Sequence, residues 1–479
     1  MTKHRLLPLA AALALFGAAC DRTPTVPNLN NPSVEDFAGS LTNEKLRVLL
    51  VGVLSQERTE LSQRYYSFTT TLGRDSYRLD TSEPRFLTET LESTGAAGGF
   101  VGGGVFTDFY VAVKASNNLL GSLNNTPELT ANERSLVKGF VETLKAHDLF
   151  RVAETRDTVG IPVAVDDPTV IAPILCKKDA LAAISTIVDA GYTDLQAAGT
   201  ATIPVTLPSG FTGIGGDFRT AANLIKYNRG LAGKILTYRA ILLNSSTLAT
   251  QAITALNIAI GGDTTSQADL NKGPYFQYST ASGETANPLF DNKLHLNPHV
   301  ADSINVADLR RSKIDSTGSG GGAAYTQTTD GVAFSTKYDF FGSKVTIGTN
   351  QTRPNPVLRT AELILLRAQA KVQAGDLAGA AADVNIVRRI EGGAALVPYA
   401  TFASAAAAIN AILYEKRYSL LFEGPQRWVD LRAYGLLNST SFTVGGKSAP
   451  YLSDPFTAAF PIPQAEKDAR DGNVTKTCT

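Results

Sequence analysis

The residues of this chain whose types could do chemistry are concentrated in one short segment near the C-terminus. A charged helical segment followed by LFEGPQRWVDLRAYG surrounds Trp428, the only tryptophan, with the acids and bases Glu415, Arg417, Glu423, Arg427, Asp430 and Arg432. Such charges could supply a catalytic carboxylate pair, or an ion-pair lattice that joins two helices. Gly424 and Pro425 should end the first helix, and Trp428 and Leu431, three residues apart, should face the core from the next. This pattern favours the lattice.

The histidines offer little metal or acid–base chemistry. His147 lies on an apolar helical face, where a hydrogen-bonded structural role is expected. His295 and His299 have the spacing of two zinc ligands on a helix, but Pro298 interrupts the helix that this alignment requires. The nucleophile elbow, the H-E-x-x-H zinc motif and the phosphate-binding loop are absent from the sequence. We therefore expect no metal, no cofactor and no catalytic residue.

The N-terminus predicts export. Residues 1–19 combine a basic start, a short apolar run and small residues before Cys20, as in a signal peptide whose cysteine becomes the lipidated first residue. Gly17 stands where a lipoprotein signal usually has Leu, so cleavage after Ala19 without lipid is the alternative. The apolar run is shorter than the about 20 residues of a membrane-spanning helix. Residues 20–38, rich in Pro and Asn, should form an extended tether.

Charge and cysteine content limit the possible binding partners and the cellular compartments in which the protein could function. The 44 Lys and Arg residues balance the 44 Asp and Glu residues, so no strong field attracts nucleic acid. If Cys20 carries lipid, Cys176 and Cys478 remain, and an oxidising compartment would permit a disulfide between them. The sequence does not give their separation, so free thiols are the alternative.

Helical periodicity dominates the chain. Apolar side chains recur three and four residues apart over 42–61, 107–123, 132–152, 178–197 and 220–243. Near the C-terminus, two amphipathic stripes flank a turn at 374–376, and Ala368 and Ala380 stand twelve apart, where tetratricopeptide repeats place small residues. The prediction is a mainly α fold, a tetratricopeptide-like helical solenoid with a scaffold at about 39–261 and 357–437.

Loop-rich insertions interrupt this scaffold at about 73–105, 262–356 and 438–465. The second is too long for a structureless loop and contains strand-like pieces, so it should form a loop-rich subdomain with short strands within a single domain, 39–479. Long loops on a rigid base commonly carry binding sites.

If these loops bind a sugar, they need aromatic rings to stack on its C–H faces and polar side chains to bond its hydroxyl groups. Because Trp428 is assigned to the core, the expected ligand-binding residues are Arg74, Asp75, Tyr77, Phe100, Tyr275, Tyr278, Tyr325 and Tyr338. Replacing Tyr275 with Ala should then affect ligand binding and spare folding. Packing within the subdomain is the alternative role for each of these residues.

Motifs spread along the whole chain resemble those of one known family. LFEGPQRWVDLRAYG supplies the run E-G-x-x-R-W-x-D-L-R through Glu423, Arg427, Trp428 and Asp430. RTAELILLRAQA is similar to a helix R-x-A-E-x-x-L-x-x-A-E-A, with Gln369 in place of the usual Glu. FPIPQAEKDARDGN, NLNNPSVEDF, LGRDSY and FTDFYVAVKASNNLL fit the C-terminal and N-terminal motifs of the same family. Together they resemble the SusD/RagB family of nutrient-uptake outer-membrane lipoproteins.

The resemblance implies a helical scaffold, a loop-rich ligand-binding half and no catalysis. It also implies capture of an oligosaccharide or peptide at the cell surface and delivery to a SusC-like TonB-dependent transporter, from a lipid anchor on the outer membrane. The alternatives are an exported tetratricopeptide-like protein–protein scaffold and a secreted glycosidase, whose two carboxylates would meet in space and not along the chain.

Overall fold

The structure is a computed structural model that describes most of the chain from residue 41 to residue 478. The residues outside this description are 1–40, 61–63, 92–99, 101–102, 283, 291–292, 316–323, 330, 341–350, 439–442, 445–446, 449–456, 473–477 and 479. The predicted signal peptide, Cys20 and the tether therefore lie outside the described residues. None of the described helices is long and apolar enough to cross a membrane.

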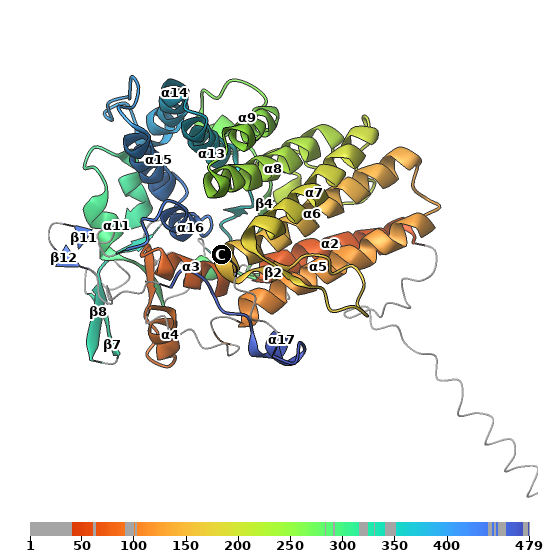
Figure 1. Cartoon of the computed structure of the whole chain (residues 1–479), viewed down its shortest axis with the longest axis horizontal. Helices are drawn as coiled ribbons and strands as arrows, with labels where there is room; N and C mark the ends of the chain where they lie inside the picture. Colours follow the sequence, from red (N-terminus) through yellow and green to blue (C-terminus); the bar gives the residue numbers. More distant parts are fainter. Residues whose placement is uncertain are drawn as a thin grey trace, which may run out of the picture.

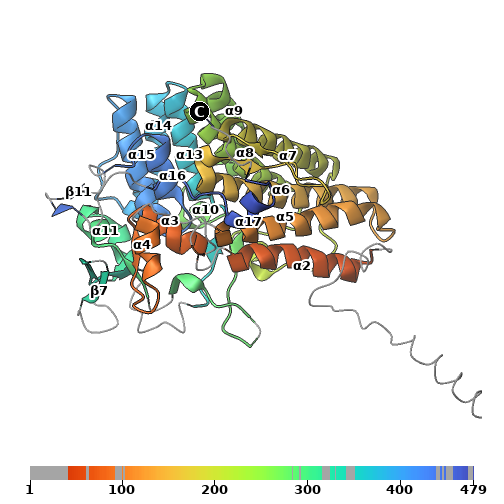
Figure 2. The same ribbon diagram turned by 60° about the horizontal axis from the view of Figure 1, so that its bottom comes forward.

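Long antiparallel helices build the first half of the scaffold. They are α2 (Asn43–Glu60), α5 (Gly104–Ser122), α6 (Ala131–Arg156), α7 (Lys177–Ala197), α8 (Ala221–Leu243) and α9 (Ser246–Ile260). Figure 1 and Figure 2 show them side by side, and α6 packs between α5 and α7. Five of these helices match the five predicted segments; α9 was not predicted. Thr130 begins α6 with a capping box to Glu133, which satisfies two otherwise unpaired backbone donors.

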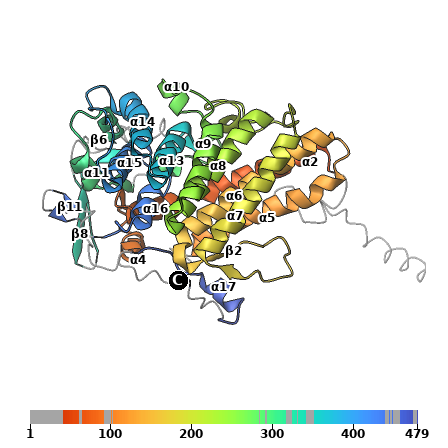
Figure 3. The same cartoon turned by 45° about the horizontal axis from the view of Figure 1, so that its top comes forward.

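Shorter helices form the second half of the scaffold. They are α13 (Thr360–Gln373), α14 (Leu377–Val387), α15 (Ala405–Ser419) and α16 (Gln426–Ala433). Ala368 and Ala380 are fully buried in one cluster, so the expected close approach of α13 and α14 at small residues is confirmed. Figure 3 shows α13 next to α8 and α9, against which it packs. The mainly α, tetratricopeptide-like fold class is confirmed.

The loop-rich segments contain short strands and short helices. Within the described residues the strands pair as β1 (Ser76–Arg78) with β5 (Leu294–Leu296), β2 (Ile161–Pro162) with β3 (Ile174–Leu175), β4 (Tyr275–Phe276) with β10 (Asn355–Pro356), β6 (Ile314–Asp315) with β9 (Asp339–Phe340), β7 (Tyr325–Thr329) with β8 (Val332–Thr336), and β11 (Thr443–Val444) with β12 (Lys447–Ser448). The short helices are α3 (Tyr66–Leu72), α4 (Thr88–Leu91), α10 (Gln267–Leu270), α11 (Pro298–Ser303) and α17 (Gln464–Asp468). In Figure 2, α4, α11 and β7 lie at the end opposite the long helices.

Trp428 is at the centre of the C-terminal core. Its side chain is fully buried, and its indole Nε1 donates a hydrogen bond of 2.9 Å to the backbone carbonyl of Thr457. The ring of Phe460 lies 5.3 Å away, and the Arg432 guanidinium lies 4.7 Å from the indole centroid. Trp428 therefore does not line an open cleft, and its predicted structural role is confirmed.

Asp430 joins four helices through one buried network. Its carboxylate lies 2.7 Å from Lys416 Nζ and accepts hydrogen bonds from Tyr238 Oη at 2.9 Å and from Gln369 Nε2 at 3.1 Å. Gln369 also accepts a bond of 3.0 Å from Lys416 through its Oε1. A neutral amide at position 369 can donate to Asp430 and accept from Lys416 at once, which a carboxylate cannot do.

The C-terminal segment is fastened back onto α6 and α7. Cys478 forms a disulfide with Cys176, which directly precedes α7, across a sequence separation of 302 residues. Phe460 donates its backbone N–H to the carbonyl of Thr155 at 2.8 Å, and Arg432 donates to the carbonyl of Glu154 at 2.7 Å. The end of the chain and α16 are thus held against the first half of the scaffold.

Replacing Trp428 with Ala should lower the free energy of unfolding by roughly 3–5 kcal/mol, because the change leaves a cavity in the core and an unpaired Thr457 carbonyl. Urea unfolding followed by circular dichroism measures this loss. A melting temperature equal to that of the wild type would show that the indole does not support the core.

Replacing Gln369 with Glu should lower the free energy of unfolding at neutral pH by roughly 1–3 kcal/mol, because a second buried carboxylate then faces Asp430 and the bond that the Gln369 amide donates to Asp430 is lost. Burial and Asp430 should raise the pKa of the new Glu above its unfolded value of about 4.3. The variant's deficit is therefore smallest below pH 4 and grows as the pH rises through the folded pKa. Chemical denaturation of both proteins from pH 4 to 8 measures this, and a deficit independent of pH would contradict it.

Candidate functional site

The loop-rich end of the molecule brings two distant insertions together. Tyr77 on β1, Leu91 on α4 and Phe334 on β8 share one small apolar cluster with Leu87. Strand β1 pairs with β5, which places Tyr77 opposite His295. Residues from the 73–105 insertion thus meet residues from the 262–356 insertion, and Figure 1 and Figure 2 show α4 beside the β7–β8 hairpin.

Three predicted ligand-binding residues lie at the buried base of this end. The side chains of Arg74, Asp75 and Tyr77 are buried. Asp75 Oδ1 accepts a hydrogen bond of 2.9 Å from Arg417 Nε on α15, and the ring of Tyr77 packs 5.4 Å from that of Phe334. Burial raises the pKa of Tyr77 to about 12. The expectation that these residues contact ligand does not fit this packing: they hold β1 to the scaffold.

Two other predicted residues lie on or next to the short strands β7, β8 and β9. The partly exposed Tyr325 stacks on His295 with ring centroids 3.8 Å apart, and its hydroxyl donates a bond of 3.1 Å to Asp339 Oδ2. The partly exposed Tyr338 lies next to Lys337, whose Nζ is 5.4 Å from the ring centroid. Aromatic rings beside charged and polar groups match what a sugar ring requires.

Phe100 adds a third partly exposed ring. It packs 4.9 Å from Phe86, and the guanidinium of Arg85 lies 4.1 Å from the Phe100 centroid. The Arg78 guanidinium on β1 lies 4.3 Å from the centroid of the Phe86 ring. Phe86 therefore connects Phe100 to β1. We define the loop face by Arg85, Phe100, Tyr325, Lys337 and Tyr338. It is the candidate ligand surface, and the sequence did not indicate the contribution of Arg85 and Lys337.

Tyr275 and Tyr278 are not part of the loop face. Tyr275 lies on β4, which pairs with β10, and both side chains are buried. The Tyr275 hydroxyl donates a bond of 2.8 Å to the carbonyl of Asn271, and a Cβ atom on Gly210 would lie 2.0 Å from the carbonyl oxygen of Tyr275. The expectation that Tyr275→Ala would spare folding does not fit these contacts, since the change would remove a buried ring and its hydrogen bond to Asn271.

Tyr275 lines a separate pocket of about 450 Å³, which we call the charged pocket. Its wall includes Asn271, Tyr275, Arg310, Lys313, Arg353, Asn355, Arg359, Glu391 and Glu423, with Ile214 and Leu309 exposed at the rim. Arg359 binds both carboxylate oxygens of Glu423, at 2.7 and 2.9 Å, and Glu391 at 2.9 Å. Of the charged residues on this wall, sequence reasoning had singled out Glu423 alone. Arg359 begins the R-x-A-E helix motif, but no local spacing pointed to Lys313 or Arg353.

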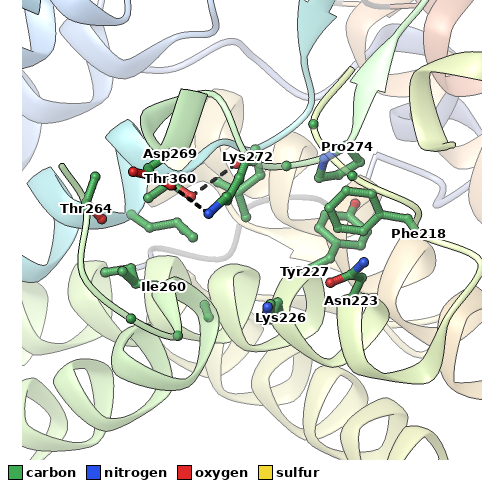
Figure 4. A pocket seen from close by; sticks show the side chains of 18 of the residues that line it. Phe218, Asn223, Lys226, Tyr227, Ile260, Thr264, Asp269, Lys272, Pro274 and Thr360 are labelled. Carbon is green, nitrogen blue, oxygen red and sulfur yellow. Dashed lines mark hydrogen bonds and ion pairs between the residues drawn. The ribbon is translucent and has the colours of Figure 1, made fainter. Parts of the chain in front are cut away.

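Figure 4 shows a second pocket, of about 330 Å³, between α8, the end of α9 and α10. Lys272 Nζ pairs with Asp269 at 2.7 Å, and the Thr360 hydroxyl donates a bond of 3.2 Å to the carbonyl of Lys272. Phe218 and Asn223 lie on the facing wall. No residue predicted to bind ligand lines this pocket.

The histidines do not assemble a metal or catalytic centre. His295 Nδ1 lies 2.8 Å from Asp339, whereas His299 follows Pro298 at the start of α11 and lies 3.1 Å from Arg417 Nη1. Burial and Arg417 lower the pKa of His299 to about 3. His147 is buried and bonded to a tyrosine hydroxyl, as expected. Within the described ranges, no group of three or more His, Cys, Asp or Glu side chains could hold a metal ion.

Comparison with known proteins gives a match in sequence and a match in fold. The SusD family model matches residues 272–475. A SusD superfamily protein from Parabacteroides distasonis is 13% identical with a TM-score of 0.67, over 90% of this chain and 98% of that one. Surface glycan-binding protein A from Bacteroides thetaiotaomicron is 13% identical with a TM-score of 0.64, over 90% and 98%. No curated protein matches the chain.

The family match covers the signature segment at Glu423–Asp430 and most of the residues on the wall of the charged pocket, while the shared fold extends over nine-tenths of the chain. Residues 272–475 thus resemble the SusD family in sequence, and the chain as a whole has the fold of SusD-like proteins.

Proposed function

We propose that this protein is a non-enzymatic, cell-surface lipoprotein that captures an oligosaccharide and delivers it to a SusC-like TonB-dependent outer-membrane transporter. The observation that carries the proposal is the fold shared with surface glycan-binding protein A from Bacteroides thetaiotaomicron, a protein whose structure is also known in complex with laminarihexaose. A peptide in place of the oligosaccharide is the alternative ligand.

Two features of this chain support capture without catalysis. The loop face offers three partly exposed rings beside Arg85 and Lys337, a combination that can stack on sugar C–H surfaces and bond hydroxyl groups. The signature carboxylates Glu423 and Asp430 are each engaged by a basic side chain in the scaffold. They are therefore unavailable as the acid and base of a glycosidase.

The export signal and the candidate lipidation site Cys20 support the proposed location. A lipid on Cys20 would hold the body near the membrane through the tether at 20–38, as a lid on a transporter requires. The SusC-like partner and the lipid anchor come from the family resemblance.

Tyr325→Ala and Phe100→Ala should each weaken binding to a retained glycan roughly three- to tenfold, because a lost aromatic stacking contact has about that free-energy value. A glycan array containing laminarihexaose identifies the ligand, and isothermal titration calorimetry then compares the variants. Tyr192→Ala, which removes a partly exposed ring from α7, is the matched control and should leave the affinity unchanged. Unchanged binding in both loop-face variants, at wild-type melting temperature, would show that the loop face is not the ligand surface.

Purification of the tagged chain from detergent-solubilised outer membrane should recover a large β-barrel protein with it. A Cys20→Ser chain is the control, because it lacks the lipidation site and should leave the membrane fraction. Mass spectrometry of the eluate measures both outcomes. Recovery of the wild-type chain alone would count against delivery to a transporter.

A further inference from the structure

The charged pocket carries hydrogen-bonding groups that the scaffold does not use. Lys313, at the end of the 3₁₀ helix Leu309–Lys313, donates two hydrogen bonds to the backbone carbonyls of Tyr418 and Ser419, at 2.9 and 2.6 Å. An ammonium group has three donors, so one remains. Lys313 forms no ion pair with a carboxylate of the described residues.

Asn355 supplies a second open donor. Its side chain is buried and lines the pocket. Its Oδ1 accepts a bond of 3.3 Å from Asn287, but its Nδ2 has no hydrogen-bond partner within the described part of the chain. A buried amide left in this state usually has a water or ligand as its missing partner.

Most acceptors on the pocket wall are already occupied. Glu423 uses both oxygens on Arg359. Glu391 Oε1 accepts bonds from Arg359 and Gln267, and its Oε2 has no partner among the described groups. Among the described wall residues, Lys313 and Asn355 therefore keep an open donor each and Glu391 an open acceptor, above an apolar rim formed by Ile214 and Leu309.

A sugar that carries a carboxylate matches this set. Its carboxylate would accept from Lys313 and Asn355, a hydroxyl would donate to Glu391 Oε2, and its C–H face would contact the rim. The volume of about 450 Å³ lies within the usual range of about 300–1,000 Å³ for ligand pockets. The backbone strain nearby fits a functional wall, since Phe422 has a φ of 64°.

We propose that the charged pocket is a second saccharide site, apart from the loop face, and that it binds the carboxylate of a uronate residue. This inference rests on the proposed glycan-capture function and specifies the class of sugar. Arg310 is balanced by Asp308 and Glu415, and Arg359 by Glu391 and Glu423. Arg353 also interacts with Glu423. We therefore assign the distinction between an acidic and a neutral sugar to Lys313 and Asn355.

The pH dependence of binding follows from the groups around Lys313. Burial lowers the pKa of Lys313 to about 8, although Glu391 and Glu423 oppose this and Arg359 and Arg310 add to it. The protonated amine binds a carboxylate, so affinity for a uronate should fall as the pH rises through about 8. A neutral sugar should not show this loss.

The test uses the chain from Cys20 onward in detergent, with trigalacturonate and its fully methyl-esterified form as probes that differ in charge. Calorimetry should give an affinity for the acid at least tenfold above that for the ester, and Asn355→Asp should weaken binding of the acid about tenfold. Asn223→Asp, the same change in the pocket of Figure 4, is the matched control and should have no effect. Lys313→Met should weaken binding of the acid to a similar extent. If the Lys313→Met variant does not fold, the Asn355→Asp variant and the pH dependence of binding test the inference.

Equal affinity for acid and ester, or an Asn355→Asp variant that binds like the wild type, would overturn the inference. Loss of trigalacturonate binding in Tyr325→Ala but not in Asn355→Asp would assign the ligand to the loop face, and the proposed function would stand without the second site. Binding of neutral glycans with no binding of trigalacturonate would also overturn the uronate site and leave the proposed function standing. Failure of every glycan would instead count against the proposed function.

Discussion

The rest of this structure depends on buried charges that are paired across distant segments. A carboxylate removed from water is stabilised only if a basic group and further hydrogen bonds replace its hydration. Glu415 illustrates the constraint: burial raises its pKa, while Arg310 and Arg388, at 2.6 and 2.7 Å, oppose that rise. Breaking one such pair leaves its partner uncompensated in the core, so these pairs hold α15 to the 3₁₀ helix Leu309–Lys313 and to the end of α14.

The lattice extends from this core to both candidate sites. On one side, Arg417 reaches Asp75 and so holds β1, the base of the loop face. On the other side, Arg359 reaches Glu423 and Glu391 and builds the wall of the charged pocket. The same kind of interaction that stabilises the helical half therefore positions the loops, which by themselves have little regular structure to keep their shape.

The indole contributes a second constraint that the charges cannot supply. Trp428 bonds Thr457 and packs on Phe460, which fastens the C-terminal segment over α16, and the disulfide to Cys176 anchors the chain beyond it. Arg432 lies over the indole and also pairs with Asp157, at 3.1 Å. Apolar packing and charge pairing are thus combined in one segment, which lies within the residues that match the SusD family model.

The sequence by itself determined the helices, the turn between the α13 and α14 stripes and the burial of Trp428, because these follow from local periodicity and helix breakers. It missed α9, although the buried residues Ala249, Ala252, Leu256 and Ala259 recur there at helical spacing, and it misjudged Tyr77, Tyr275 and Tyr278. Only the tertiary structure decided which loop aromatics are exposed, that Asp430 meets Gln369 and Tyr238, and that Lys313 and Asn355 share one pocket wall. Burial and pairing depend on residues hundreds of positions apart, and no local pattern encodes which of these meet.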